Sequence, residues 1–248
     1  MTPSNTTQYF ERSQRLLGTL VMQRLAETRV ILFGCGGVGS WCAESLVRSG
    51  LGHITIVDND VVCPSNCNRQ LMATTSTVGQ NKVEAMKKRL LELNPELDIT
   101  IHAKFYDAAS AHEFHLENYD FIIDAIDSLA SKAHLILQAT ALPKTITLLC
   151  SMGAALRIDP QKVRAGEFWD IKGDALARAL RNKFKKDKTF PKRKFTCVYS
   201  EEVALPNQGE CSDSANGSLS HITGTFGFML AGLVIKKITS EMQKTLQE

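Results

Sequence analysis

The sequence predicts an α/β fold, with a Rossmann-like, mostly parallel sheet that is flanked by helices and carries an irregular C-terminal extension of the same domain. Short β-branched runs alternate with longer amphipathic stretches, as in chains built from right-handed β-α-β crossovers. A glycine-rich turn directly follows the first run, Arg29–Phe33. The 248 residues suffice for one large domain, and the 44% of hydrophobic residues is ordinary for a soluble globular protein.

The first part of the chain alternates expected strands with expected helices. The strands are short apolar runs, typical of a buried parallel sheet; the first stops at glycines and the second ends in an acid. In chain order these strands are 29–33, 53–58, 98–103, 120–124 and 145–149. The helices at 38–49, 80–93 and 131–141 follow from helical spacing, and Asn94-Pro95 closes the charged amphipathic helix 80–93.

The pattern is weaker after Met152-Gly153, where we expect the irregular extension. Its expected elements are a strand at 163–168, a basic helix at 174–186, a strand at 194–199, a mobile loop at 207–216 and a closing helix at 218–238 that contains three glycines. We interpret residues 1–248 as a single domain, with a nucleotide-binding core at about 8–155 and a substrate-facing part at about 156–248.

Composition excludes several classes of protein. The seven cysteines form no C-x-x-C pair, which argues against a structural zinc site. The odd number of cysteines and the polar opening segment predict a reducing cytoplasmic location and no disulfide framework. The apolar run 226–235 is about half the length that a bilayer requires, so a buried helix is expected there and no membrane span. The net charge is +3, but segment 178–194 holds nine Lys/Arg and one acid, which leaves −5 for the rest.

The turn Gly34-Cys-Gly-Gly-Val-Gly39 lies between a strand and a helix, and its glycines are Gly34, Gly36, Gly37 and Gly39. Glycines let the backbone approach phosphates, and the helix N-terminus presents free N–H groups to them. Nucleotide binding is favoured over a tight turn without a ligand, although the motif does not separate NAD from ATP. Asp58 follows at the end of the second strand, where an acid can accept hydrogen bonds from ribose hydroxyls. A turn or cap acid is the alternative, and the role of Asp60 stays open.

Three charged residues favour ATP over NAD. Arg69 offers a planar fork to phosphate oxygens, Lys82 supplies a point charge at a helix start, and Asp127 follows a strand end and can hold Mg²⁺ on a triphosphate. Such groups are expected in nucleotidyl transfer, because negative charge builds on the α-phosphate and the leaving pyrophosphate. Each alone is more often a solvated charge, but the three in this order point to catalysis.

On these residues the sequence resembles the ubiquitin-activating-enzyme-like adenylating proteins, a family that includes the activators of bacterial sulfur carriers. The resemblance covers about residues 8–155. It rests on the glycine turn, Asp58-Asn-Asp60, Asn66-x-Asn-Arg69-Gln70, Lys82 and Asp127. It implies ATP and Mg²⁺ as cofactors, with the phosphates against Gly37 and the ribose on Asp58.

The resemblance also implies roles for the remaining motif residues. Asn66 and Arg69 of the Asn66–Gln70 motif would bind the triphosphate together with Lys82, and Asp127 would lie at the metal and phosphates with Ser128 nearby. Arg15 matches an arginine that in this family often reaches across a homodimer to the partner's ATP, so a homodimer is expected. Cysteine desulfurase or sulfur-acceptor partners are implied as well.

Within the family the sequence is similar to a branch that acts on tRNA, through Gly37-Val-Gly-Ser-Trp41, Asp124-Ala-Ile-Asp-Ser128 and Cys197-Val-Tyr-Ser-Glu201. This branch activates the carboxylate of a threonylcarbamoyl group on a tRNA adenosine with ATP, and an internal nucleophile then closes the ring. The alternatives are activation of a ubiquitin-like sulfur carrier, which the missing zinc cysteines disfavour, and a non-catalytic partner-binding member. An NAD dehydrogenase is the least favoured alternative.

Two further features bear on function. Segment 178–194 is expected to bind tRNA, with Phe184, Phe190 and Phe195 available to stack on unpaired bases, although a solvated helix face is the alternative. Cys197 is a candidate nucleophile, but its apolar neighbour and a cyclisation that needs no enzyme nucleophile favour a core residue. Whether Asp124 assists a metal stays open.

Overall fold

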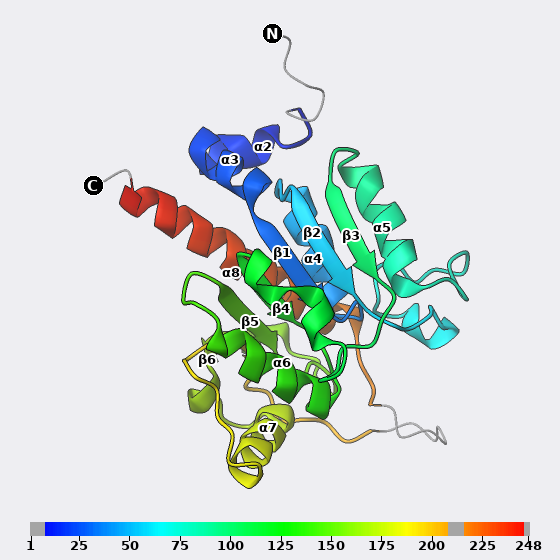
Figure 1. Cartoon of the computed structure of the whole chain (residues 1–248). Helices are drawn as coiled ribbons and strands as arrows, with labels where there is room; N and C mark the ends of the chain where they lie inside the picture. The colour runs from blue at the N-terminus through cyan, green and yellow to red at the C-terminus, as the bar shows by residue number, and fades with distance from the viewer. Residues whose placement is uncertain (1–7, 208–215, 246–248) are drawn as a thin grey trace.

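Seven strands form one sheet in the order β3-β2-β1-β4-β5-β7-β6 in the computed structural model, which describes residues 8–207 and 216–245 (Figure 1). The strands are β1 Arg29–Phe33, β2 His53–Val57, β3 Asp98–His102, β4 Phe121–Asp124, β5 Thr147–Ser151, β6 Val163–Glu167 and β7 Thr196–Ser200. All neighbours are parallel except β6 and β7. The predicted Rossmann-like, mostly parallel sheet is therefore confirmed.

The α-helices among the described residues agree with the expected ones to within a few positions, with two exceptions. They are α2 Glu11–Leu17, α3 Thr19–Glu27, α4 Gly39–Arg48, α5 Lys82–Leu93, α6 Leu129–Ala141, α7 Ala175–Lys186 and α8 Ser220–Thr245. The sequence analysis did not predict α2 and α3, and α8 runs beyond the expected end at 238. The expected loop 207–216 lies mostly outside the described residues.

The glycines of α8 do not break this helix, and one of them permits its packing. A Cβ at Gly227 would lie 2.6 Å from the carbonyl oxygen of Val38 and 2.8 Å from the amide nitrogen of Cys42. Since a real Cβ cannot approach backbone atoms so closely, Gly227 lets α8 lie directly on α4. The low helix propensity of glycine is outweighed here by tertiary packing.

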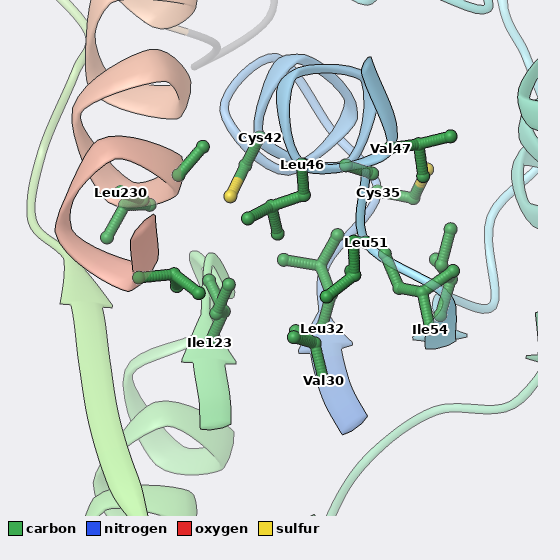
Figure 2. Packing of buried hydrophobic residues seen from close by; sticks show 14 of the residues in the cluster. Val30, Leu32, Cys35, Cys42, Leu46, Val47, Leu51, Ile54, Ile123 and Leu230 are labelled. Carbon is green, nitrogen blue, oxygen red and sulfur yellow. The ribbon is translucent and has the colours of Figure 1, made fainter. Parts of the chain in front are cut away.

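The core lies on both faces of the sheet, because the side chains of each central strand alternate between them. Val30 and Leu32 of β1 belong to the cluster under α4, α5 and α8, whereas Ile31 and Phe33 belong to the cluster under α6 and α7. Figure 2 shows the first cluster, in which side chains of α4 meet the strands from above and Leu230 of α8 approaches from the side. These two layers fix the strand ends that carry the site.

Helix α8 is the one helix in the described ranges that is long and apolar enough to cross a membrane. Half of its most apolar window is buried inside the protein, and its main neighbours are α4 and α3. Burial of this kind is typical of a core helix, as the apolar run 226–235 led us to expect.

Candidate functional site

A cavity of about 700 Å³ opens at the carboxyl ends of the parallel strands. Strands β2 and β4 flank β1, and their crossovers leave in opposite directions along the sheet, so this edge is a topological switch point, where α/β proteins bind ligands. The cavity has two halves. One is lined by the glycine turn and the charged residues singled out in the sequence, and the other by residues 151–157 after β5 and the start of α7.

The glycine turn needs its glycines for separate reasons. Gly34 has φ +91°, and a Cβ there would lie 2.6 Å from the carbonyl oxygen of Ala125. A Cβ on Gly37 would meet the side chain of Thr223 at 3.0 Å, so the cradle between turn and α8 has no room for a side chain. Gly34, Gly36 and Gly37 line the cavity, whereas Gly39 does not. A Cβ on Gly39 would lie 1.8 Å from the oxygen of Gly34, so it serves the close packing of the turn.

Asp58 lies at the cavity wall where β2 ends. Its carboxylate accepts hydrogen bonds from the backbone N–H of Cys35 at 2.7 Å and of Asp60 at 2.9 Å. Burial raises the pKa of Asp58 above its ordinary value, and the charge of Lys82 and the two N–H donors oppose this shift. The carboxylate thus ties the end of β2 to the glycine turn and keeps free lone pairs for a ligand hydroxyl.

Lys82 is almost fully buried at the start of α5, with 7% of its side chain exposed. Its Nζ lies 2.7 Å from Oδ2 of Asp60, whose side chain is 58% exposed. Both residues line the cavity. The structure therefore holds the lysine ammonium at the wall with one flexible carboxylate that an incoming anion can displace.

Arg69 and Gln70 follow one another on the same wall. The Arg69 guanidinium donates to the carbonyl oxygen of Ser65 and to Oδ1 of Asn68, both at 2.9 Å. Gln70 is buried, lines the cavity, and its Oε1 has no hydrogen-bond partner among the described residues. A buried amide oxygen without a partner is costly, so this group is suited to a ligand donor.

Asp127 and Ser128 line the cavity between β4 and α6, and Asp127 is exposed. Asp124, three residues earlier, is fully buried: its Oδ1 accepts from Nζ of Lys132 at 2.8 Å and from the N–H of Ile126 at 3.0 Å. Lys132 also donates to the carbonyl oxygen of Ile126 at 3.0 Å. Asp124 is thus turned away from the cavity, and its ion pair with Lys132 fixes the loop that presents Asp127.

Besides Gly39, two of the predicted site residues do not line the cavity. The Asn66 side chain is buried and accepts a hydrogen bond from the N–H of Cys63 at 3.0 Å, which closes a short 3₁₀ helix behind the wall. Arg15 projects from α2 with 68% of its side chain exposed and pairs with Glu11 at 2.5 Å. Within one chain, the structure does not bring Arg15 to the cavity.

No group of three His, Cys, Asp or Glu that could hold a metal ion exists in the ranges 8–207 and 216–245. A magnesium ion on ATP needs only one or two carboxylates, since phosphates and water complete its shell. Cys63 and Cys67 are exposed and free. Cys197 is fully buried on β7 in register with Cys150 of β5, which places it in the core and not at the cavity.

The basic segment 178–194 covers most of α7 and the turn after it. Lys183, which is half-buried, pairs with Asp187 at 2.8 Å, and the other cations divide into two groups. Arg181 donates to the carbonyl oxygen of Phe168 at 3.1 Å, and Arg193 donates to three carbonyl oxygens around residues 139–146, so both brace the fold. The exposed cations are Arg178, Lys185, Lys186, Lys188, Lys192 and Lys194.

The expectation that three phenylalanines of this segment stack on bases is wrong for two of them. Phe184 is 1% exposed and Phe195 is 5% exposed, because both pack against Phe168 in the core. Phe190 alone of the three is open, at 48%. Helical spacing of apolar residues on α7 signals this inward face.

The sequence analysis missed four residues that shape the site. Lys132 positions the loop at Asp127, and Thr223 of α8 closes the glycine cradle. Asp174 caps α7 through the N–H of Ala177 and also accepts from the N–H of Gly153 at 3.2 Å. Arg157 lines the second half of the cavity. Only Asp174 had a sequence signal, as an acid before an amphipathic helix.

Comparison with known proteins gives one consistent result. The ThiF family matches residues 10–248 of this chain. The tRNA threonylcarbamoyladenosine dehydratase of Haemophilus influenzae is 35% identical over 248 residues, which cover 94% of each chain. A more distant relative, the adenylyltransferase and sulfurtransferase MOCS3 of Drosophila virilis, is 28% identical over 87% of this chain and 41% of its own length.

Solved structures agree with these relatives. The E. coli tRNA N6-threonylcarbamoyladenosine dehydratase in complex with AMP is 33% identical, with a TM-score of 0.88 over 98% of this chain and 99% of that one. Its complex with ATP is 32% identical, with a TM-score of 0.87 over the same shares. The fold of this chain is thus that of a protein whose crystals hold AMP or ATP.

Proposed function

This chain belongs to the ThiF family, and we infer from its cavity and its relatives that it is an ATP-dependent tRNA threonylcarbamoyladenosine dehydratase. The reaction removes one water from the modified adenosine. A carboxylate is a poor electrophile, and transfer of AMP to it creates a good leaving group. The released AMP carries away the carboxylate oxygen, and a nucleophile within the substrate closes the ring.

The observation that carries this proposal is the cavity itself, which joins a nucleotide half to a second half within one space. Bringing the carboxylate and the α-phosphate together supplies much of the rate, since it removes the entropic cost of their encounter. We assign the ribose to Asp58, and the phosphates to the glycine turn and to the side-chain amide N–H donors of Gln70. Lys82 and Arg69 would stabilise the negative charge that develops on the α-phosphate and pyrophosphate.

Magnesium belongs to this proposal. Asp127 is exposed at the cavity, and its carboxylate has no hydrogen bond or ion pair among the described residues; oxygen ligands of this kind suit Mg²⁺. When bound, the ion would neutralise phosphate charge. Asp60 is the second carboxylate at the wall, but its pairing with Lys82 supports a role in holding that lysine.

Three proposals concern the setting of the enzyme. A homodimer would bring Arg15 to the partner's ATP, in keeping with its exposed place outside its own cavity. The exposed cations of α7 and the following turn would bind tRNA phosphates. A cytoplasmic location is supported by the free cysteines of the described chain.

Mass spectrometry of nucleosides tests the function directly. The protein is incubated with ATP, Mg²⁺ and tRNA that carries threonylcarbamoyladenosine, and the digested tRNA is analysed. The expected result is loss of the mass of one water, which requires hydrolysable ATP and is absent with a non-hydrolysable analogue. Unchanged nucleoside mass with active ATP cleavage would refute the proposal.

Activation of a ubiquitin-like sulfur carrier is the second candidate, supported by the similarity to MOCS3. It would need the same nucleotide half, with a carrier C-terminus in place of the tRNA nucleoside. Pyrophosphate exchange into ATP separates the two candidates. Exchange that depends on the modified tRNA supports the dehydratase, and exchange that depends on a carrier protein supports this alternative. Cysteine desulfurase partners would accompany the second outcome.

A further inference from the structure

One cation in the second half of the cavity has no hydrogen-bond or ion-pair partner among the residues that the structure describes. Arg157 follows β5 by six positions, lines the cavity, and is 4% exposed. Its Nε and Nη1 atoms are buried without a hydrogen-bond partner among residues 8–207 and 216–245. A buried, uncompensated guanidinium is costly, because the charge loses its hydration and gains nothing in return.

The other cations of the cavity wall are already engaged. Lys82 pairs with Asp60, Arg69 donates to Ser65 and Asn68, and Lys104 pairs with Glu113. Among the cations that line the described part of the cavity, Arg157 is therefore the one with neither an ion pair nor a side-chain hydrogen bond. A ligand anion in the cavity would supply the partner that the described residues do not.

The backbone around Arg157 is held on both sides. Leu156 has φ +61°, a left-handed conformation that is strained for a leucine. Its N–H donates to the carbonyl oxygen of Gly217 and its carbonyl accepts from the N–H of Leu205, both at 2.9 Å. Ile158, the residue after Arg157, donates its backbone N–H to the carboxylate of Glu202. Such a bent, pinned segment fixes where the arginine side chain starts, and strain of this kind clusters at functional sites.

The same segment is linked to the phosphate end of the site. The carbonyl oxygen of Ile158 lies 3.0 Å from Nε2 of His221 on α8. Two residues further on, Thr223 packs at the position that a Cβ on Gly37 would occupy. Arg157, Thr223 and Gly37 all line the cavity. The backbone next to Arg157 is thus tied to the helix that also closes the glycine turn, and all three residues face one cavity.

We propose that Arg157 binds the carboxylate of the threonylcarbamoyl group and holds it beside the α-phosphate before adenylation. This inference rests on the proposed function. A guanidinium presents paired N–H donors that match the two oxygens of a carboxylate. We assign Lys82 and Arg69 to the phosphates of ATP, which leaves Arg157 as the cation of the second half of the described lining that can meet the reacting carboxylate. Arg157 then distinguishes a nucleoside with this carboxylate from unmodified adenosine.

A binding experiment separates this role from the alternatives. Anticodon stem-loop RNAs that carry threonylcarbamoyladenosine or plain adenosine are titrated by fluorescence anisotropy against wild type, Arg157→Gln and Arg157→Lys. Lys88→Gln, which removes an exposed charge on α5, is the matched control. Wild type and the control should prefer the modified RNA. Arg157→Gln should lose about 10- to 100-fold in affinity for the modified RNA only, the range for a charged hydrogen bond, and Arg157→Lys should recover part of it.

Kinetics and stability give independent readouts. Because the carboxylate contact exists before the transition state, Arg157→Gln should raise KM for modified tRNA more than it lowers kcat. Its Tm without ligand should stay equal or rise, since an uncompensated buried charge is removed. A large fall in Tm would instead mean a structural role and would overturn the proposal.

Three other results would also overturn it. If Arg157→Gln weakens the binding of both RNAs equally, Arg157 binds a tRNA phosphodiester. If it weakens ATP binding, Arg157 binds the nucleotide. If the wild-type protein binds both RNAs equally well, there is no contact with the carboxylate. Failure of the proposed function is distinct from all of these. It would appear as a wild-type protein that removes no water from the nucleoside, whatever residue occupies position 157.

Discussion

Two lysines beside the cavity have almost no solvent exposure, and each pairs with one carboxylate. Lys82 meets Asp60, a largely exposed acid, whereas Lys132 meets Asp124, which is as buried as the lysine itself. The first pair can open when an anion arrives, because Asp60 regains water. The second cannot open without leaving a bare charge in the core. Residues of one type thus serve ligand binding in one place and loop rigidity in the other.

Replacement of Lys82 by alanine is expected to lower kcat for dehydration by about 100-fold or more, the range for loss of one preorganised charge-stabilising group. The fold should survive, since Asp60 is exposed and needs no partner. Circular dichroism and nucleoside mass spectrometry measure the two properties. Lys88→Ala, on the exposed side of the same helix, is the control and should behave as wild type. Full activity of Lys82→Ala would exclude the lysine from the site.

The Lys132→Met variant is expected to lose about 3–5 kcal/mol in the free energy of unfolding, as when a buried ion pair keeps only one member. Burial raises the pKa of Asp124, and the loss of Lys132 removes the strongest opposing charge. The difference in the free energy of unfolding between wild type and Lys132→Met should therefore shrink as pH falls, because Asp124 then takes up a proton in the folded state.

Urea denaturation at several pH values measures this effect. In the double variant Lys132→Met/Asp124→Asn no bare charge remains, so its stability should exceed that of the single variant. A stable Lys132→Met protein at neutral pH would contradict the argument.

Cys197→Ser is expected to retain most of the dehydratase activity, because ring closure by the substrate itself needs no thioester. The thiol is fully buried and does not line the cavity. Some loss of stability is expected from burying a hydroxyl, and Cys197→Ala serves as the apolar control. An inactive but folded protein in both variants would favour a covalent route.

The two faces of helix α7 have different roles. Its inner face packs Leu180 and Phe184 into the core, and its last turn and the following loop expose lysines. Replacement of Lys185, Lys186 and Lys188 by alanine should weaken tRNA binding and reduce the slope of log K against log salt by up to about three, without an effect on ATP affinity.

Anisotropy titrations at several salt concentrations measure this slope. A control that removes Lys87, Lys88 and Lys236 changes the net charge equally on other helices. An unchanged slope in the α7 variant, or an equal change in the control, would mean that tRNA docks elsewhere.

The sequence predicted the elements that carry their own pattern. β1 and β2 were placed from their apolar runs, and the glycine turn from residues that only a tight turn requires. Helices α2 and α3 were missed, because each is short and α2 has no buried residue to mark a face. Arg157 could not be found either. The neighbouring Leu156 is held by hydrogen bonds with segments far along the chain, at Gly217 and Leu205, and no local sequence pattern records them.

At the scale of the whole molecule, the place of Arg15 predicts a test of the homodimer. In a two-fold symmetric dimer with shared sites, Arg15 of one chain would complete the Lys82 site of the other. Arg15→Ala and Lys82→Ala proteins should each be inactive. When mixed and allowed to exchange subunits, they should regain about a quarter of wild-type activity, since half of random dimers are mixed and each holds one intact site. No recovery after confirmed exchange would place both residues in the same chain's site.

The contact between α8 and the glycine turn has a consequence for biosynthesis. Gly37 and Val38 are made early, but the helix that covers them, with Thr223 and Gly227, follows every strand of the sheet in the sequence. A chain still on the ribosome before α8 emerges has one side of its first core cluster open to water. Its phosphate cradle is also unfinished, so ATP cannot yet assist its folding by mass action. The first core cluster and the phosphate cradle are therefore completed together, by the last helix of the described chain.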